Sequence, residues 1–143
     1  MFRIPVLSFL LLLALPVCAL AGEITYSKNI RPLVEARCGG CHGADAPEYP
    51  AFKADKDAWV ARQTGPRMDT YAHLIYYTAW PDTGALMRRL DDAKPGNMYQ
   101  YLGDNDAERQ QNLLLFKNWV GSWPLKKWSE MTKEELDGIK VPY

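Results

Sequence analysis

Two cysteines and a histidine lie within five consecutive positions, in the segment CGGCH at Cys38, Cys41 and His42. Two thiols and an imidazole at this spacing can attach a haem, ligate zinc, exchange a disulfide or form a plain disulfide. The whole chain contains three cysteines and two histidines, so this short segment holds most of them. The spacing therefore indicates a site that does chemistry.

A covalently attached haem accounts for all three side chains. Thiols three positions apart can reach the two vinyl groups at one edge of a porphyrin, and the next imidazole can reach the iron from one face. Gly39 and Gly40 keep side chains away from the ring edge between the two thiols. We predict that Cys38 and Cys41 form thioethers to one haem c and that His42 is the proximal iron ligand.

The other chemistries explain fewer of these residues. A zinc site would need His73 as a further ligand, and adjacent ligands at Cys41 and His42 would strain a tetrahedron. A thioredoxin-like redox pair belongs to alternating strands and helices, which this sequence lacks. A plain disulfide leaves His42 without a role.

The first 21 residues have the order of an export signal. A cationic start at Arg3 precedes a long apolar run, and Ala19–Leu20–Ala21 puts small residues where a signal peptidase reads. The run is short for a membrane span, which needs about 20 apolar residues. We expect residues 1–21 to be removed, leaving residues 22–143 without a membrane span in the bacterial periplasm, where haem is attached.

The charge balance argues against polyanionic partners. The sequence has 17 Lys and Arg against 17 Asp and Glu, a formal net charge of zero. A neutral chain gives no electrostatic case for binding nucleic acid or an anionic membrane surface.

The periodicity predicts an all-α fold of short helices joined by long loops. Helices are expected over residues 26–38, 55–63, 69–80, 83–92 and 105–121, and loops over residues 42–54 and 93–103. Asn105 and Glu108 are spaced as a capping box, and Gly121 suits a helix end. We predict one domain over residues 22–121, with a tail over residues 122–143 that packs on it or extends it.

Two segments resemble the monohaem class I c-type cytochromes of bacterial periplasms. They are YSKNIRPLVEARCGGCHG, which leads into the haem motif, and GNMYQYLGDNDAERQQNLLLFKNWVG, a methionine loop before a terminal helix. The resemblance implies a cytochrome c-like bundle around one covalently bound haem. It also implies that the first and last helices cross beside the haem, pairing residues 30–34 with residues 113–120.

The sixth iron ligand decides the function. A methionine gives a low-spin carrier of raised potential, a second imidazole lowers the potential, and an open position binds gases or peroxide. Met98 lies before the terminal helix, where the resembling family places its ligand. The alternatives are His73 on a helix, Met87 among apolar residues and Met68 in a turn.

Other residues could contact the haem or a partner. Arg88 or Arg89 could reach a haem propionate, although a solvated helix face explains both. We expect one-electron transfer between Fe(III) and Fe(II) with transient redox protein partners, and no enzymatic activity. The alternatives are a gas sensor or peroxidase-like protein, with His73 beside Arg67 or Arg88, or a subunit of a larger redox complex docked through its tail.

Overall fold

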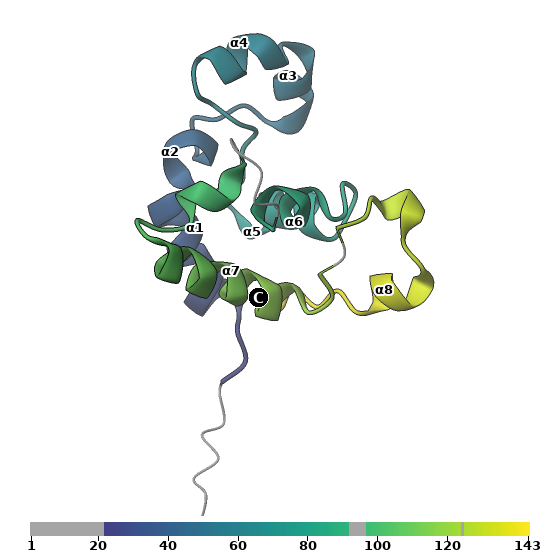
Figure 1. Ribbon diagram of the computed structural model, residues 1–143. Coiled ribbons are helices and arrows are strands. Elements are labelled where there is room, and N and C mark those ends of the chain that lie inside the picture. The colour runs from purple at the N-terminus through teal and green to yellow at the C-terminus, as the bar shows by residue number, and fades with distance from the viewer. Residues whose placement is uncertain (1–21, 92–96, 124) are drawn as a thin grey trace, which may run out of the picture.

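Helices and their connections make up the described chain, residues 22–91, 97–123 and 125–143 of a computed structural model (Figure 1). These residues form no strand beyond an isolated bridge between Gly121 and Ile139. None of their helices is long and apolar enough to cross a membrane. The helices are η1 Tyr26–Ile30, α1 Arg31–Arg37, α2 Gly39–His42, α3 Tyr49–Ala54, α4 Lys56–Ala61, α5 Tyr71–Thr78, α6 Ala85–Leu90, η2 Met98–Tyr101, α7 Asp106–Val120, η3 Trp128–Glu130 and α8 Lys133–Asp137. The predicted all-α fold of short helices is confirmed.

The first helical segment starts with the π-helical turn η1 and continues directly into α1. Thr25 caps η1, because its side chain accepts a hydrogen bond from an amide of that turn. Pro32 lies in the first turn of α1, where its missing N–H costs no helical hydrogen bond. The resulting register puts Tyr26, Ile30 and Val34 on one buried face.

Helix α7 is the longest element, and polar residues fix both of its ends. Asn105 is the N-cap and accepts a hydrogen bond from the Glu108 amide at 3.0 Å. The Glu108 carboxylate accepts from the amide of Asp104 instead of Asn105, so the predicted capping box is shifted by one residue. The helix ends at Gly121, whose φ of 79° favours glycine.

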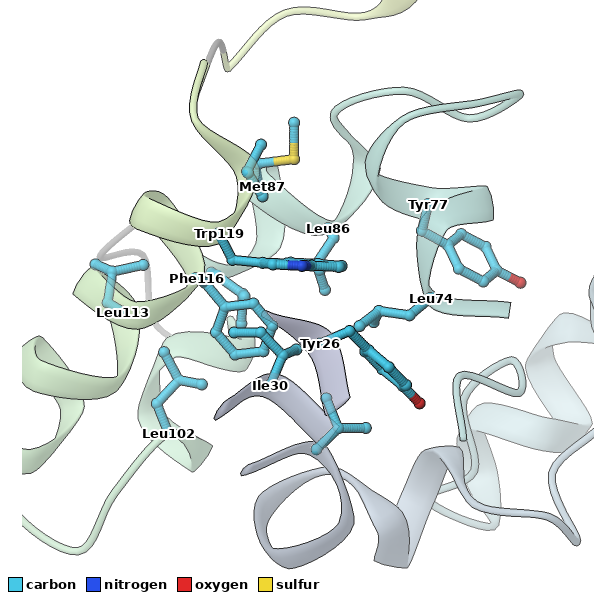
Figure 2. Close-up of a cluster of buried hydrophobic side chains, with 13 residues drawn as sticks. Tyr26, Ile30, Leu74, Tyr77, Leu86, Met87, Leu102, Leu113, Phe116 and Trp119 are labelled. Atoms are coloured by element: carbon cyan, nitrogen blue, oxygen red, sulfur yellow. The ribbon is translucent and has the colours of Figure 1, made fainter. Parts of the chain in front are cut away.

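The hydrophobic core lies where α7 crosses η1 and α1, with α5 and α6 completing it (Figure 2). Ile30, Trp119 and Val120 have no exposed surface. Fully burying such a side chain contributes about 1.5–3 kcal/mol. The buried cluster consists of Tyr26, Ile30, Val34, Leu74, Tyr77, Leu86, Met87, Leu90, Leu102, Leu113, Phe116, Trp119 and Val120.

The C-terminal residues return to the first and last helices. The amides of Tyr26 and Ser27 donate to the carbonyls of Pro142 and Tyr143, each at 2.9 Å. The indole N–H of Trp119 also donates to Pro142, at 2.8 Å. Between this return and α7, helices η3 and α8 form an arm that extends to one side (Figure 1).

Helices α3 and α4 form a small lobe that projects from the rest of the chain (Figure 1). Neither helix contains a buried residue. The prediction of a loop over residues 42–54 is wrong for α3, because Pro50 lies at the start of that helix, where proline is tolerated. At the end of α4, the guanidinium of Arg62 lies 4.5 Å from the centroid of the Trp59 ring.

Candidate haem site

Cys38 ends α1 and begins the single turn of α2. Its amide donates to the Val34 carbonyl at 2.9 Å, and its carbonyl accepts from the amides of Cys41 and His42 at 3.1 and 2.9 Å. Both thiols are free, with Cys38 half-buried and Cys41 exposed. This helical turn sets the two sulfurs three residues apart on neighbouring positions of one surface, as two bonds to one ring edge require.

The imidazole of His42 is oriented by a backbone carbonyl. Its Nδ1 lies 2.6 Å from the Pro66 carbonyl oxygen, so Nδ1 carries the donated proton and Nε2 keeps its lone pair. A carbonyl on one ring nitrogen commonly orients a metal-binding histidine. Burial lowers the pKa of His42, opposed by the hydrogen bond to Pro66. The neutral imidazole favoured by burial is the form that binds a metal.

Gly65 gives this imidazole its space. A Cβ at position 65 would lie 2.1 Å from Cε1 and 2.6 Å from Nδ1 of His42, so any side chain would displace the ring. No motif in the sequence marks Gly65 or Pro66 as functional residues. The Gly–Pro pair signals only a turn, and its partner lies 24 residues away from Pro66 in the chain.

Three main-chain hydrogen bonds, each of 2.9 Å, hold residues 65–68 against the motif and the loop that follows it. They run from the amides of Gly65, Arg67 and Met68 to the carbonyls of Cys41, Pro47 and His42, respectively. The lobe of α3 and α4 therefore begins and ends beside the predicted proximal ligand. Apolar contacts add to these bonds, because Ala46 and Pro47 are buried and Tyr49 packs against the hydrophobic core.

The environment of the cysteines disfavours the alternative chemistries. Burial, with a smaller contribution from Cys41, raises the pKa of Cys38 to about 11. A dithiol that exchanges disulfides needs a lowered thiol pKa instead. Among the described residues, no three His, Cys, Asp or Glu side chains gather so that they could hold a metal ion, which leaves the zinc alternative without a ligand set.

The three candidate methionines lie in different surroundings. Met87 has no exposed surface and belongs to the hydrophobic core (Figure 2). Met68 is half-buried, and its amide is bonded to the carbonyl of the motif histidine. Met98 is half-buried against the core at the start of η2, where its amide donates to the side-chain oxygen of Asn97 at 3.0 Å. Of the predicted loop over residues 93–103, residues 93–96 lie outside the described residues, and Met98–Tyr101 form the short helix η2 instead of a loop.

The remaining candidate, His73, belongs to a polar group that we call the His73 cluster, with Glu48, Arg67, Asp69 and Thr70. Its Nδ1 lies 3.0 Å from Oδ1 of Asp69 and 2.9 Å from Oγ1 of Thr70. Its Nε2 lies 3.7 Å from Oε1 of Glu48. Arg67 donates two hydrogen bonds to the same Asp69 carboxylate, at 2.7 and 2.9 Å. The fold therefore brings His73 and Arg67 to one carboxylate, a contact that no sequence pattern predicts.

Comparison with known proteins assigns the family. Residues 25–143 match the family described as PccH cytochrome c. The chain belongs to this family. A solved structure titled "Structure of monoheme cytochrome PccH from Geobacter sulfurreducens" is 65% identical to it, with a TM-score of 0.80, and the match covers 85% of this chain and 100% of that one. No curated protein matches.

As a member of the PccH cytochrome c family, the protein is a monohaem c-type cytochrome, an electron carrier with one covalently bound haem c. The family and the cofactor predicted from the sequence are thereby confirmed. The described residues fit this group. Cys38 and Cys41 are free thiols on one turn, the Nε2 lone pair of His42 is left available by the bond at Nδ1, and Gly65 leaves the ring room.

The two arginines at the end of α6 have different surroundings in this PccH-family cytochrome. Nη1 of Arg88 donates to the carbonyls of Lys126 and Thr83, at 2.8 and 3.2 Å. Nη2 of Arg88 lies 3.8 Å from Oδ1 of Asp82. Arg88 therefore ties the C-terminal arm to α6, and Arg89 is exposed. A contact to a haem propionate stays a prediction for both.

Proposed function

We propose that this PccH-family cytochrome is exported to the bacterial periplasm and passes single electrons between redox proteins. In this proposal Cys38 and Cys41 hold the haem through thioethers, His42 is the proximal ligand and Met98 the distal one. The bound haem supplies a one-electron Fe(III)/Fe(II) couple. The observation that carries the proposal is the 2.6 Å contact from Nδ1 of His42 to Pro66, which leaves Nε2 for the iron.

The surroundings of the four candidates support Met98 as the distal ligand. The two axial ligands must approach the iron from opposite faces of the porphyrin. The backbone of Met68 is bonded to the His42 carbonyl and so runs on the proximal side. Met87 is sequestered in the hydrophobic core, and both ring nitrogens of His73 face side-chain oxygens. Met98 comes from a separate element and is half-buried.

A histidine–methionine pair suits an electron carrier. The thioether raises the potential and fills the sixth position, so no coordination site is open to gases or peroxide. A peroxidase-like centre would need an acid–base pair facing the iron opposite the proximal histidine. Arg67 and His73 instead share Asp69, which directly follows the segment bonded to the proximal motif. The position of Arg67 and His73 does not support a peroxidase-like centre.

The expected partners are redox proteins that bind transiently. Such complexes have small interfaces, which bury less than about 1,200 Å² of total accessible surface. A small interface lets the carrier leave quickly after each electron transfer, at the expense of affinity.

A fixed subunit of a larger redox complex is the second candidate, favoured by exposed aromatic side chains near the C-terminal arm. Trp80 and Trp128 are 60% and 47% exposed, and their ring centroids lie 5.2 Å apart. Leu125 is 49% exposed. Size-exclusion chromatography of the protein from its native source separates the two candidates, because a free carrier elutes as a monomer and a subunit elutes with its partner.

Absorption spectra of the purified mature protein test the main proposal. Oxidised and reduced samples are recorded with and without carbon monoxide. We expect low-spin spectra that the gas does not change, and haem that stays on the polypeptide under denaturing conditions. The control variant Cys38→Ala/Cys41→Ala should release any haem when denatured. A high-spin spectrum, or ready uptake of carbon monoxide, would contradict the carrier function.

A further inference from the structure

Asn97 is a buried amide directly before Met98, with 8% of its surface exposed. Its Oδ1 accepts a hydrogen bond from the amide of Met98 at 3.0 Å, and its Nδ2 donates to the carbonyl of Arg88 at 3.3 Å. A polar side chain at this depth costs free energy unless it is hydrogen-bonded, and both polar groups of this amide have partners. The side chain therefore links the main chain of Met98 to that of Arg88.

The far end of this link is helix α6, which is fixed in the hydrophobic core. Leu86 and Met87 of this helix are buried among the core residues (Figure 2). Arg88 lies in the last turn of α6, where carbonyls have no partner within the helix. Asn97 supplies a donor to one of these carbonyls, and so it fixes the start of η2 relative to the core.

The residues that follow η2 are held from helix α7 instead. Nδ2 of Asn112 donates to the carbonyl of Leu102 at 2.6 Å, and Nε of Arg109 donates to the carbonyl of Gly103 at 3.0 Å. Neither bond involves Met98. The two ends of this segment thus have separate supports, and the support beside Met98 comes from Asn97.

Helix capping alone explains only half of the geometry of Asn97. A capping side chain accepts a hydrogen bond from an amide at the start of its own helix, as Oδ1 of Asn105 does for α7. Capping does not require the Nδ2 group to reach a different helix. The bond from Nδ2 of Asn97 to α6 adds a tertiary restraint to the cap.

We propose that Asn97 is a positioning residue that holds the main chain of Met98 so that its thioether stays on the iron. The inference rests on the proposed function, since it requires Met98 as the distal ligand. A methionine side chain has several rotatable bonds, so a restrained main chain lowers the entropic cost of keeping the sulfur in place. Removing a group that orients a metal ligand typically weakens metal binding by about 10–100-fold.

Competition with free imidazole measures how firmly Met98 is held. Imidazole binds the oxidised, haem-loaded protein by replacing the thioether, so its apparent affinity rises by the factor by which binding of Met98 weakens. Loss of the weak long-wavelength iron–sulfur absorption band follows this exchange. We expect imidazole to bind Asn97→Ala about tenfold more tightly than it binds the wild type.

Asn112→Ala is the matched control, because the same substitution there removes a hydrogen bond to the same segment without involving Met98. A general loosening of the segment would raise the imidazole affinity of both variants, whereas a loss of positioning raises that of Asn97→Ala alone. We expect the imidazole affinity of Asn112→Ala to equal that of the wild type. An unchanged affinity in Asn97→Ala, or an equal increase in both variants, would overturn the inference.

Asn97→Ser decides the question if Asn97→Ala fails to assemble. Serine keeps an oxygen that can cap η2, but it has no N–H to donate to Arg88, so the cap is retained and the link to α6 is lost. Imidazole should again bind more tightly than to the wild type, and an unchanged affinity would overturn the inference. In each of these outcomes the wild type keeps its iron–sulfur band and the proposed function stands. A wild type without that band would instead contradict Met98 as the distal ligand, and with it both proposals.

Discussion

The core around α7 and the loop that carries the haem motif are held together in different ways. In the core, Ile30, Trp119 and Val120 are fully buried, and apolar area removed from water supplies the stability. In the loop, α2, α3 and α4 contain no buried residue. Backbone hydrogen bonds to the motif, the packing of one imidazole against Gly65 and the contact of Tyr49 with the core order it instead. Most of the apolar burial thus lies in a different part of the chain from the haem motif.

This difference explains why most side chains of the proposed site are half-buried. Cys38, His42, Met68 and Met98 all have intermediate exposure, between the buried core and the surface. A flat ring lying against such side chains would complete their burial, as apolar cofactors do in pockets with few polar groups. The core needs no cofactor to complete its burial, since its residues already contact one another.

The largest expected effect is in the core. Trp119→Ala should cost about 3–5 kcal/mol in the free energy of unfolding, because it removes a fully buried indole and leaves a cavity. Denaturant unfolding followed by circular dichroism measures this cost. The absorption spectrum of the fraction that remains folded should keep its low-spin form. A changed spectrum with little loss of stability would show that the two regions are not separate.

The next effect is in the loop. Gly65→Ala should cost about 1–3 kcal/mol, as overpacking does, and should also disturb the haem spectrum, because the new Cβ would overlap the His42 imidazole. Gly22→Ala is the control, since a Cβ there has no atom within 4 Å and the residue lies outside the haem motif. Thermal unfolding and absorption spectra of both variants measure the difference. Equal stabilities and equal absorption spectra of the two variants would contradict this account.

Local signals in the sequence predicted the features that depend on neighbouring residues. The spacing of Cys38, Cys41 and His42 is a local property, and the helix that contains it follows from its own periodicity. The N-cap at Asn105 and the glycine at Gly121 mark the ends of α7 in the same way. Each of these features lies within a few positions of the residues that cause it.

Features that depend on distant residues could not be predicted. Pro66 meets His42 only because residues 43–64 fold back on the motif, and no periodic pattern encodes that return. His73 and Arg67 share Asp69 through the shape of one turn. Helix α3 is not predicted because proline commonly indicates a loop, whereas Pro50 lies in the first turn of this helix. Met98 was favoured through the resemblance to a family rather than through its surroundings.

A smaller effect is expected from the cap of α7. Asn105→Ala removes the side-chain oxygen that accepts the Glu108 amide, and such a loss typically costs about 1 kcal/mol. The control Asn118→Ala lies on the exposed side of the same helix, so it should be neutral or slightly stabilising, given the helix propensity of alanine. Denaturant unfolding of the two variants gives the comparison. A cost shared by both would mean that the cap contributes nothing specific.

The smallest expected effect depends on pH. The hydrogen bonds from Arg67 lower the pKa of Asp69, so the folded protein stabilises the ionised carboxylate more than the unfolded chain does. That contribution is present above about pH 4, the unfolded value, and is lost as the pH falls through the lowered folded value. Asp69→Asn should therefore cost about 0.5–1 kcal/mol at pH 7, as partly exposed ion pairs do. Unfolding curves are measured between pH 2 and 7, and the free energies of unfolding of wild type and variant should converge in acid. A difference that stays constant over this range would show that the ionised Asp69 carboxylate is not its cause.

The most direct test of the account is the weak long-wavelength iron–sulfur absorption band of the oxidised protein. It should be measured in the wild type, in Met98→Ala and in Met68→Ala, two variants that each remove one half-buried methionine. The account predicts that the band is present in the wild type and in Met68→Ala and absent in Met98→Ala. A band that survives in Met98→Ala and disappears in Met68→Ala would contradict the assignment of Met98 as the distal ligand and of Met68 to the proximal side.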